Sequence, residues 1–285
     1  MWKIFIGIIE YLPLWLFIKI MGLFRYRPRI QIGSSVIAFA IRYIPKFRNR
    51  VYNNLELIFP DLSKKEKSTF LKEFSQNLGT TFTEFLFNND FHNKQKIDLK
   101  DPTKLDPISA AVKNNQPVII VSGHFGPWEA VRAILRKNGL EAGAVYRKSR
   151  NIFYQPYHHK TISAGGTPIF QTGRKGTGEM IRYLKNGGII CLMIDQSVSD
   201  GHYLDFLGKP AKTSLAIANL AIKYNAILVP AYATRKKDRA SIQVELDSPI
   251  PITMPNEMTK KVLHGLSKKV LANPTQWYWV HNRWK

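Results

Sequence analysis

A histidine and an acid lie close together in a turn that contains two glycines. Residues 123–126 read Gly-His-Phe-Gly, and Glu129 follows His124 after four intervening residues. A carboxylate near an imidazole can hold the ring in one tautomer and stabilise its protonated form. An imidazole held in this way can take the proton from a hydroxyl whose oxygen attacks a thioester carbonyl. We therefore predict that His124 is a general base and that Glu129 orients it.

No nucleophilic serine or cysteine lies beside this pair, which favours direct transfer between two bound substrates over a covalent intermediate. The single cysteine, Cys191, is part of the apolar run 189–194 and is expected to be a packed core residue. One cysteine cannot form an intramolecular disulfide, which favours a reducing compartment. From position alone, the alternative is that His124 is incidental to a capped helix N-terminus.

The elements around these residues favour the functional interpretation. The apolar run 118–121 is typical of a buried parallel strand, and a helix is expected over about 127–136. Sites in open α/β sheets gather where strands end and helices begin. Asp195 and Gln196 likewise follow the apolar run 189–194, so Asp195 could orient a substrate or another side chain, or only cap the region near Ser214.

The rest of the chain alternates between strand-like and helix-like patterns. This alternation predicts an α/β fold with a mostly parallel or mixed central sheet flanked by helices. A capping box at residues 63–66 begins the helix expected before the sheet. The further expected strands are 142–146, 227–232 and 241–246, the further helices are 63–87, 178–185, 214–224 and 256–271, and 88–104 is expected to be a loop.

The first 24 residues are mostly Ile, Leu, Phe and Trp, and arginines follow at positions 25, 27 and 29. Pro13 and the internal charges interrupt a clean membrane span, so a helix embedded in one leaflet fits at least as well. A buried helix of a soluble protein is the alternative. We predict a membrane-embedded segment over 1–29 and a single α/β domain over 30–285.

Positive charge is in large excess. The chain has 42 Lys and Arg against 20 Asp and Glu, a formal net charge of +22. Such a surface attracts nucleic acid, anionic lipid headgroups or an acidic protein. A non-catalytic nucleic-acid-binding protein would explain the charge but not the apolar N-terminus or the Gly-His-Phe-Gly turn. No nucleic-acid partner is therefore expected.

Several blocks of sequence, in order along nearly the whole chain, resemble the lipid A biosynthesis acyltransferases, the lauroyl and myristoyl transferases of Gram-negative bacteria. These enzymes belong to the lysophospholipid acyltransferase-like superfamily. The block containing His124 and Glu129 is similar to the family's catalytic motif. The other matching blocks are 11–14, 50–60, 145–151, 195–213 and 274–285.

The resemblance implies an acyltransferase fold and a bacterial inner-membrane enzyme whose catalytic domain faces the cytoplasm. It implies acyl carrier protein as donor and a hydroxyl of a lipid A precursor as acceptor. Acyl carrier protein and the lipid A precursor are both anionic. Anionic membrane lipids are also expected to bind the positively charged surface. The alternatives are a lysophospholipid or other glycolipid as acceptor with acyl-CoA as donor, and a catalytically inactive membrane scaffold.

The resemblance also suggests substrate-binding residues. Arg147 and Arg174 are the candidates to meet the acceptor phosphate or the developing oxyanion, although Lys148 stands where the family usually has proline. Asp195 and Gln196 are the other candidates. No cofactor is expected, and neighbouring His158 and His159 point apart, so no metal is expected either. The tail tryptophans at 277, 279 and 284 could be interfacial or could pack the core.

Overall fold

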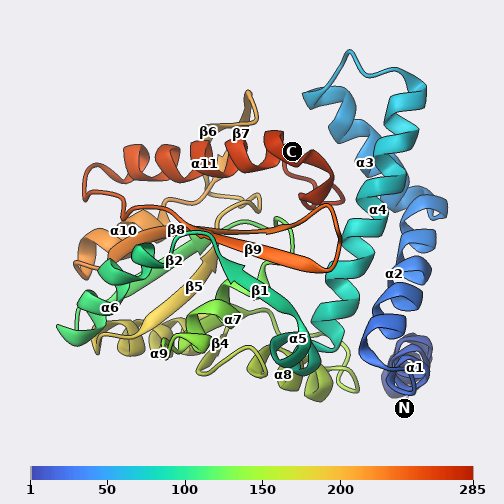
Figure 1. The fold of residues 1–285 in the computed structure, drawn as a ribbon, viewed down its shortest axis with the longest axis horizontal. Coiled ribbons are helices and arrows are strands. Elements are labelled where there is room, and N and C mark those ends of the chain that lie inside the picture. Colours follow the sequence, from blue (N-terminus) through green and yellow to red (C-terminus); the bar gives the residue numbers. More distant parts are fainter. Residues whose placement is uncertain (1, 285) are drawn as a thin grey trace.

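A seven-stranded sheet forms the centre of the molecule in a computed structural model that describes residues 2–284 (Figure 1). The strand order is β1-β9-β8-β2-β5-β3-β4, and the strands from β8 to β4 are mutually parallel. β9 is antiparallel to β8 and pairs in parallel with β1. The strands are β1 Lys96–Leu99, β2 Val118–Ser122, β3 Ala142–Tyr146, β4 Ile169–Gln171, β5 Ile189–Met193, β8 Ile227–Arg235 and β9 Ser241–Leu246, with the separate hairpin β6 His202–Phe206 and β7 Lys209–Thr213.

Both faces of this sheet are covered, so β2 is buried along its whole length. Ile119 and Val121 pack into the core under α10 and α11, whereas Val118 and Ile120 pack into the core under α6 and α7. This alternation follows from the two-residue period of a strand. The helices here are α6 Asp106–Lys113, α7 Glu129–Lys137, α9 Arg174–Lys185, α10 Ala216–Lys223 and α11 Pro255–Ala272.

Four N-terminal helices lie together along one side of the sheet layer (Figure 1). α1 is the apolar helix, and its segment Ile4–Gly22 is long and apolar enough to cross a membrane while being mostly exposed. α4 begins at the predicted capping box, in which Ser63 and Glu66 bond each other reciprocally. The bounds are α1 Trp2–Gly22, α2 Tyr26–Tyr43, α3 Pro45–Ile58 and α4 Lys64–Leu86, followed by α5 Asn88–Lys94 and, after β3, α8 Gln155–Ser163.

The predicted fold class is confirmed, and one segment was predicted wrongly. Residues 88–104, expected to be a loop, form α5, β1 and the start of a 3-10 turn at 102–105. β1 is short and polar, and it is a strand because it pairs with β9, a contact that its own sequence does not reveal. The tail tryptophans Trp277 and Trp279 are fully buried, so they pack the core.

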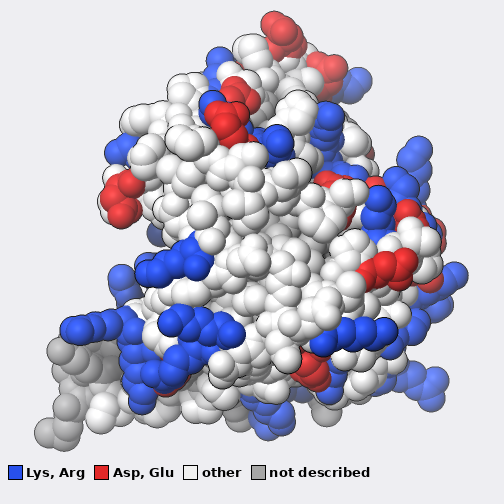
Figure 2. All heavy atoms as spheres, turned by 90° about the vertical axis from the view of Figure 1, so that its left-hand side faces the viewer, with Lys and Arg blue, Asp and Glu red and all other residues white. Residues whose placement is uncertain are grey.

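Lys and Arg are spread over the face shown in Figure 2 and are densest in its lower part, with fewer Asp and Glu among them. On this face the positive charge is therefore distributed over several places rather than gathered in one compact stripe. A positive field of this kind attracts an anionic surface from many approach directions.

Candidate active site

His124 and Asp195 meet at the carboxyl ends of the neighbouring strands β2 and β5. The Nδ1 atom of His124 lies 2.8 Å from the Asp195 carboxylate, and the backbone N–H of His124 donates to the same carboxylate at 2.7 Å. The Asp195 side chain is 2% exposed and the His124 side chain 21%. An ionised carboxylate only accepts hydrogen bonds, so Nδ1 donates to it, and in the neutral imidazole the lone pair is then on Nε2.

Burial by itself would raise the pKa of Asp195, but the adjacent His124 and its hydrogen bonds, with a further one from Trp277, lower it below its usual value. Trp277 donates its indole N–H to Asp195 at 2.8 Å. The carboxylate is therefore ionised at neutral pH and held by three donors. This arrangement fixes the histidine ring in one orientation.

Gly126 allows the chain to turn tightly after the histidine. Its φ of +54° is in the left-handed region, and a Cβ placed there would lie 2.0 Å from the carbonyl oxygen of Ala233. The Gly126 N–H donates to the carbonyl of Gln276 at 2.8 Å, and Phe125 forms a β-bridge with Trp277. The C-terminal segment thus holds the turn from one side and Asp195 from another.

Glu129 begins α7, and its carboxylate is held by residues other than His124. It accepts hydrogen bonds from Arg132 and from Asn88, each at 3.2 Å, and His92 Nε2 lies 3.7 Å away. Burial alone would raise the pKa of Glu129, but the Arg132 charge, with the contacts from His92 and Asn88, lowers it. In this structure the carboxylate that contacts His124 Nδ1 is that of Asp195, whereas the Glu129 carboxylate contacts Arg132, one helical turn ahead.

A cavity of about 840 Å³ opens over these residues. His124, Glu129, Arg147 and Gln196 all line it, so four of the six predicted site residues share one space. Asp195 does not line the cavity, but its carboxylate contacts His124 Nδ1. Arg174 is exposed at the start of α9 and is not among the residues that line this cavity.

Cys191 also lines the cavity, and desolvation raises the pKa of its thiol to about 12. A thiol with so high a pKa is protonated at neutral pH and is a poor nucleophile. This agrees with the prediction that the site works without a covalent enzyme intermediate.

Several residues that complete the site were not predicted from the sequence. Tyr278 and Trp128 contact the His124 ring, with ring centroids 5.8 and 5.5 Å away. Arg132 also donates to the carbonyls of Ile162 and Gly166, and so ties α7 to the end of α8 and to the segment after it. The signal available in the sequence was the placement of Arg132 three residues after Glu129, the spacing of an ion pair on one helix face.

Comparison with known proteins places this geometry in a family. A profile described as bacterial lipid A biosynthesis acyltransferase matches residues 2–285. The chain is 23% identical to the lipid A biosynthesis lauroyltransferase of Escherichia coli (strain K12) over 280 residues, covering 95% of this chain and 89% of that protein. It is 20% identical to the phosphatidylinositol mannoside acyltransferase of Mycobacterium tuberculosis (strain CDC 1551 / Oshkosh) over 184 residues, covering 63% of this chain and 58% of the length of that relative.

The match over almost the whole chain includes the strand-turn-helix unit that carries His124 and the C-terminal segment that holds it. The chain belongs to the bacterial lipid A biosynthesis acyltransferase family.

Proposed function

We propose that this acyltransferase moves a fatty acyl chain from acyl carrier protein onto a hydroxyl of a lipid A precursor at the cytoplasmic face of the bacterial inner membrane. The observation that supports it most directly is the His124–Asp195 hydrogen bond at the edge of a cavity of about 840 Å³. The family supports the reaction class, and the lauroyltransferase relative supports the acceptor class.

In the proposed mechanism, Nε2 of His124 takes the proton of the acceptor hydroxyl as its oxygen attacks the thioester carbon. Asp195 stabilises the imidazolium that forms, as the acid of a catalytic triad does. The C–S bond then breaks, and the departing thiolate takes the proton back from the imidazolium. Ester and free thiol leave the site, and no group remains bound to the protein.

Glu129 has a positioning role in this proposal. With Arg132 it fixes the first turn of α7, which forms part of the cavity wall. Arg147 and Gln196, which line the same cavity, are proposed to meet the acceptor phosphate or the developing oxyanion. Arg174, outside this lining, stays a weaker candidate for the same phosphate.

An apolar groove of about 450 Å³ offers a place for the acyl chain. It lies between α1, α2 and α4, and both Phe82 and Tyr278 line it. Tyr278 also contacts the His124 ring, so the groove and the base are adjacent. An acyl chain in the groove with its thioester beside His124 would have its apolar surface removed from water.

The second candidate is an acyltransferase that acts on another glycolipid or on a lysophospholipid, with acyl-CoA as donor. The similarity to the mycobacterial phosphatidylinositol mannoside acyltransferase supports a glycolipid acceptor as this second candidate. The same histidine chemistry would serve, so donor and acceptor have to be separated by assay.

The test is an assay of membranes that contain the protein, with acyl-acyl carrier protein or acyl-CoA as donor. A tetra-acylated lipid A precursor and a lysophospholipid serve as acceptors, and product masses are recorded. Wild type, His124→Ala and Lys113→Ala, an exposed residue outside the cavity, are compared. We expect the lipid A precursor to gain one acyl group from the carrier protein with wild type and Lys113→Ala only. A product formed only from the lysophospholipid or acyl-CoA would establish the second candidate, and product from His124→Ala would refute the proposed base.

A further inference from the structure

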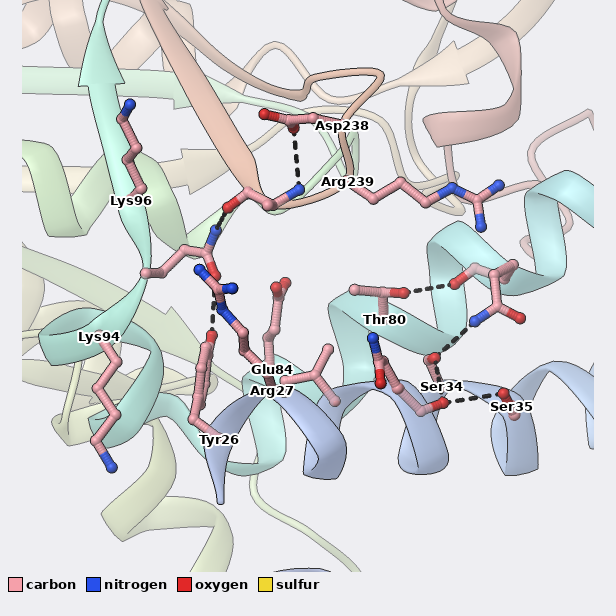
Figure 3. Close-up of a pocket in the computed structure, with 15 residues that line it drawn as sticks. Tyr26, Arg27, Ser34, Ser35, Thr80, Glu84, Lys94, Lys96, Asp238 and Arg239 are labelled. Atoms are coloured by element: carbon pink, nitrogen blue, oxygen red, sulfur yellow. Dashed lines mark hydrogen bonds between the residues drawn. The ribbon is translucent and has the colours of Figure 1, made fainter. Parts of the chain in front are cut away.

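A second pocket, of about 470 Å³, lies on another side of α4 from the active-site cavity. Thr80 and Glu84 of α4 line it, whereas Phe82 and Phe85 of the same helix face the active-site cavity. α2, the start of β1 and the β8–β9 turn form its other walls (Figure 3). No step proposed for His124 uses this pocket.

Two arginines approach the pocket from different elements. Arg27 comes from α2 and Arg239 from the β8–β9 turn, and Figure 3 shows them on opposite sides of the space. Among residues 2–284, no carboxylate oxygen lies within 4.0 Å of the guanidinium nitrogens of Arg27 or of Arg239. Lys94 and Lys96 stand at the outer edge and point away from the centre of the view.

The carboxylates at the pocket are already engaged. Glu84 is bound at both oxygens by the buried Arg235, an ion pair whose side chains are each 4% exposed. Asp238 accepts hydrogen bonds from the Ala240 and Ser241 N–H groups of its own turn, at 3.0 Å each. Arg27 and Arg239, which no carboxylate among the described residues pairs, therefore remain available to a ligand.

An exposed apolar surface adjoins the cationic pocket. Gln31 and Ser35 of α2 line both the pocket and a shallow neighbouring hollow formed with Ile32, Val36 and Phe39. These three side chains are 39%, 50% and 62% exposed. A phosphate site next to an exposed aliphatic surface matches a molecule with an anionic head and an apolar tail.

We propose that this pocket binds the phosphate headgroup of an anionic membrane phospholipid, whose acyl chains lie along Ile32, Val36 and Phe39. Bidentate arginine contacts suit a phosphodiester. The polar side chains Gln76 and Thr80 of α4 donate within the protein, to the Ser34 hydroxyl and the Gln76 carbonyl, so the phosphate contacts are assigned to the two arginines. The inference rests on the proposed membrane association but not on acyl transfer. The bound lipid would hold α2 against the bilayer.

The test is native mass spectrometry of the full chain in detergent, titrated with dioleoyl phosphatidylglycerol or dioleoyl phosphatidylcholine. We expect wild type to retain the phosphatidylglycerol preferentially. Arg27→Gln/Arg239→Gln should weaken that binding by about tenfold for each guanidinium, which corresponds to about 1.4 kcal/mol each. The control Lys113→Gln/Lys137→Gln removes the same charge from exposed positions that do not line the pocket, and it should bind as wild type does.

Two further arms identify the source of the phosphate. Ile32→Ser/Phe39→Ser should weaken phosphatidylglycerol binding, and inorganic phosphate should not displace the lipid. Equal retention of both lipids, equal loss in the lysine control, or displacement by inorganic phosphate would each overturn the proposal. Membrane sedimentation of the same variants is measured separately, so a failure of membrane association is distinguished from a failure of this site.

Discussion

At the scale of single residues, the proposed mechanism requires Asp195 to hold His124 in the tautomer that can act as a base. Asp195→Asn preserves size but places an amide where a carboxylate accepts the Nδ1 proton, which favours the wrong tautomer. We expect kcat/KM to fall by about two to four orders of magnitude. Steady-state rates from the product-mass assay would check this, with membrane content matched between samples. A rate within a few-fold of wild type would remove Asp195 from the mechanism.

The lowered pKa of Asp195 also sets the direction of a stability effect. Because the folded-state pKa lies below the unfolded value of 3.8, the ionised carboxylate stabilises the fold above that pH. This contribution is lost as the pH falls from 3.8 through the folded-state pKa. We expect the melting temperature of wild type to drop across that interval and that of Asp195→Asn to drop less. Parallel melting curves against pH would contradict the assignment.

The positioning role proposed for Glu129 predicts that it and Arg132 stabilise the fold as a coupled pair. Glu129→Gln leaves Arg132, whose side chain is 4% exposed, without its carboxylate. We expect a loss of about 1–3 kcal/mol in the free energy of unfolding, since a buried charge loses its partner. Arg132→Met and the double variant Glu129→Gln/Arg132→Met complete a double-mutant cycle. The double variant should lose less free energy of unfolding than the two single variants lose together. Additive losses would show that the pair is not coupled.

At the scale of elements, the turn after β2 depends on Gly126. Gly126→Ala places an alanine at positive φ, which is strained, and it puts a Cβ 2.0 Å from the Ala233 carbonyl oxygen. Gly139→Ala is the matched control, because Gly139 also has positive φ but no atom within 4 Å of its added Cβ. We expect Gly139→Ala to cost about 1 kcal/mol and Gly126→Ala to cost more and abolish activity. The urea midpoints of unfolding of the two variants measure this difference. Equal losses of stability would contradict the predicted clash between the added Cβ and the Ala233 carbonyl.

Prediction from sequence succeeded where a pattern is local and failed where a contact is distant. The β2-turn-α7 unit was predictable because a buried strand, a glycine turn and an amphipathic helix each have a local signature. The Asp195 partner of His124 is 71 residues away, and the Trp277 partner of Asp195 is 82 away. No spacing rule links such positions, so the sequence pairs His124 with the nearer acid, Glu129, and does not reveal the hydrogen bond from His124 to Asp195. β1 was missed for the same reason, since β9 makes it a strand.

At the scale of the whole molecule, α1 connects the proposed membrane surface to the active site. Asn151, in the segment after Arg147, donates to the Gly7 carbonyl at 2.7 Å, and Tyr11 packs against Tyr154 with ring centroids 5.9 Å apart. The segment that leaves β3 beside the cavity is therefore attached to the apolar helix. A lipid substrate would reach His124 without leaving the bilayer surface for bulk water.

The attachment of the apolar helix to the cavity predicts that polar substitutions on the exposed face of α1 release the protein from the membrane. Ile9, Leu12 and Leu16 are each about half exposed, so replacing all three with Asp leaves the interior contacts of the helix in place. Each Asp costs up to about 3 kcal/mol at the centre of a span, and less in an interfacial helix. We expect the triple variant to move from the membrane pellet to the supernatant after a high-salt wash and to lose activity on membrane-bound acceptor.

Replacing Lys113, Lys137 and Lys261 with Ala makes the same change in net charge on exposed positions elsewhere. If that control is released equally, surface charge rather than α1 holds the protein at the membrane; if only the α1 variant is released, the apolar helix is the anchor.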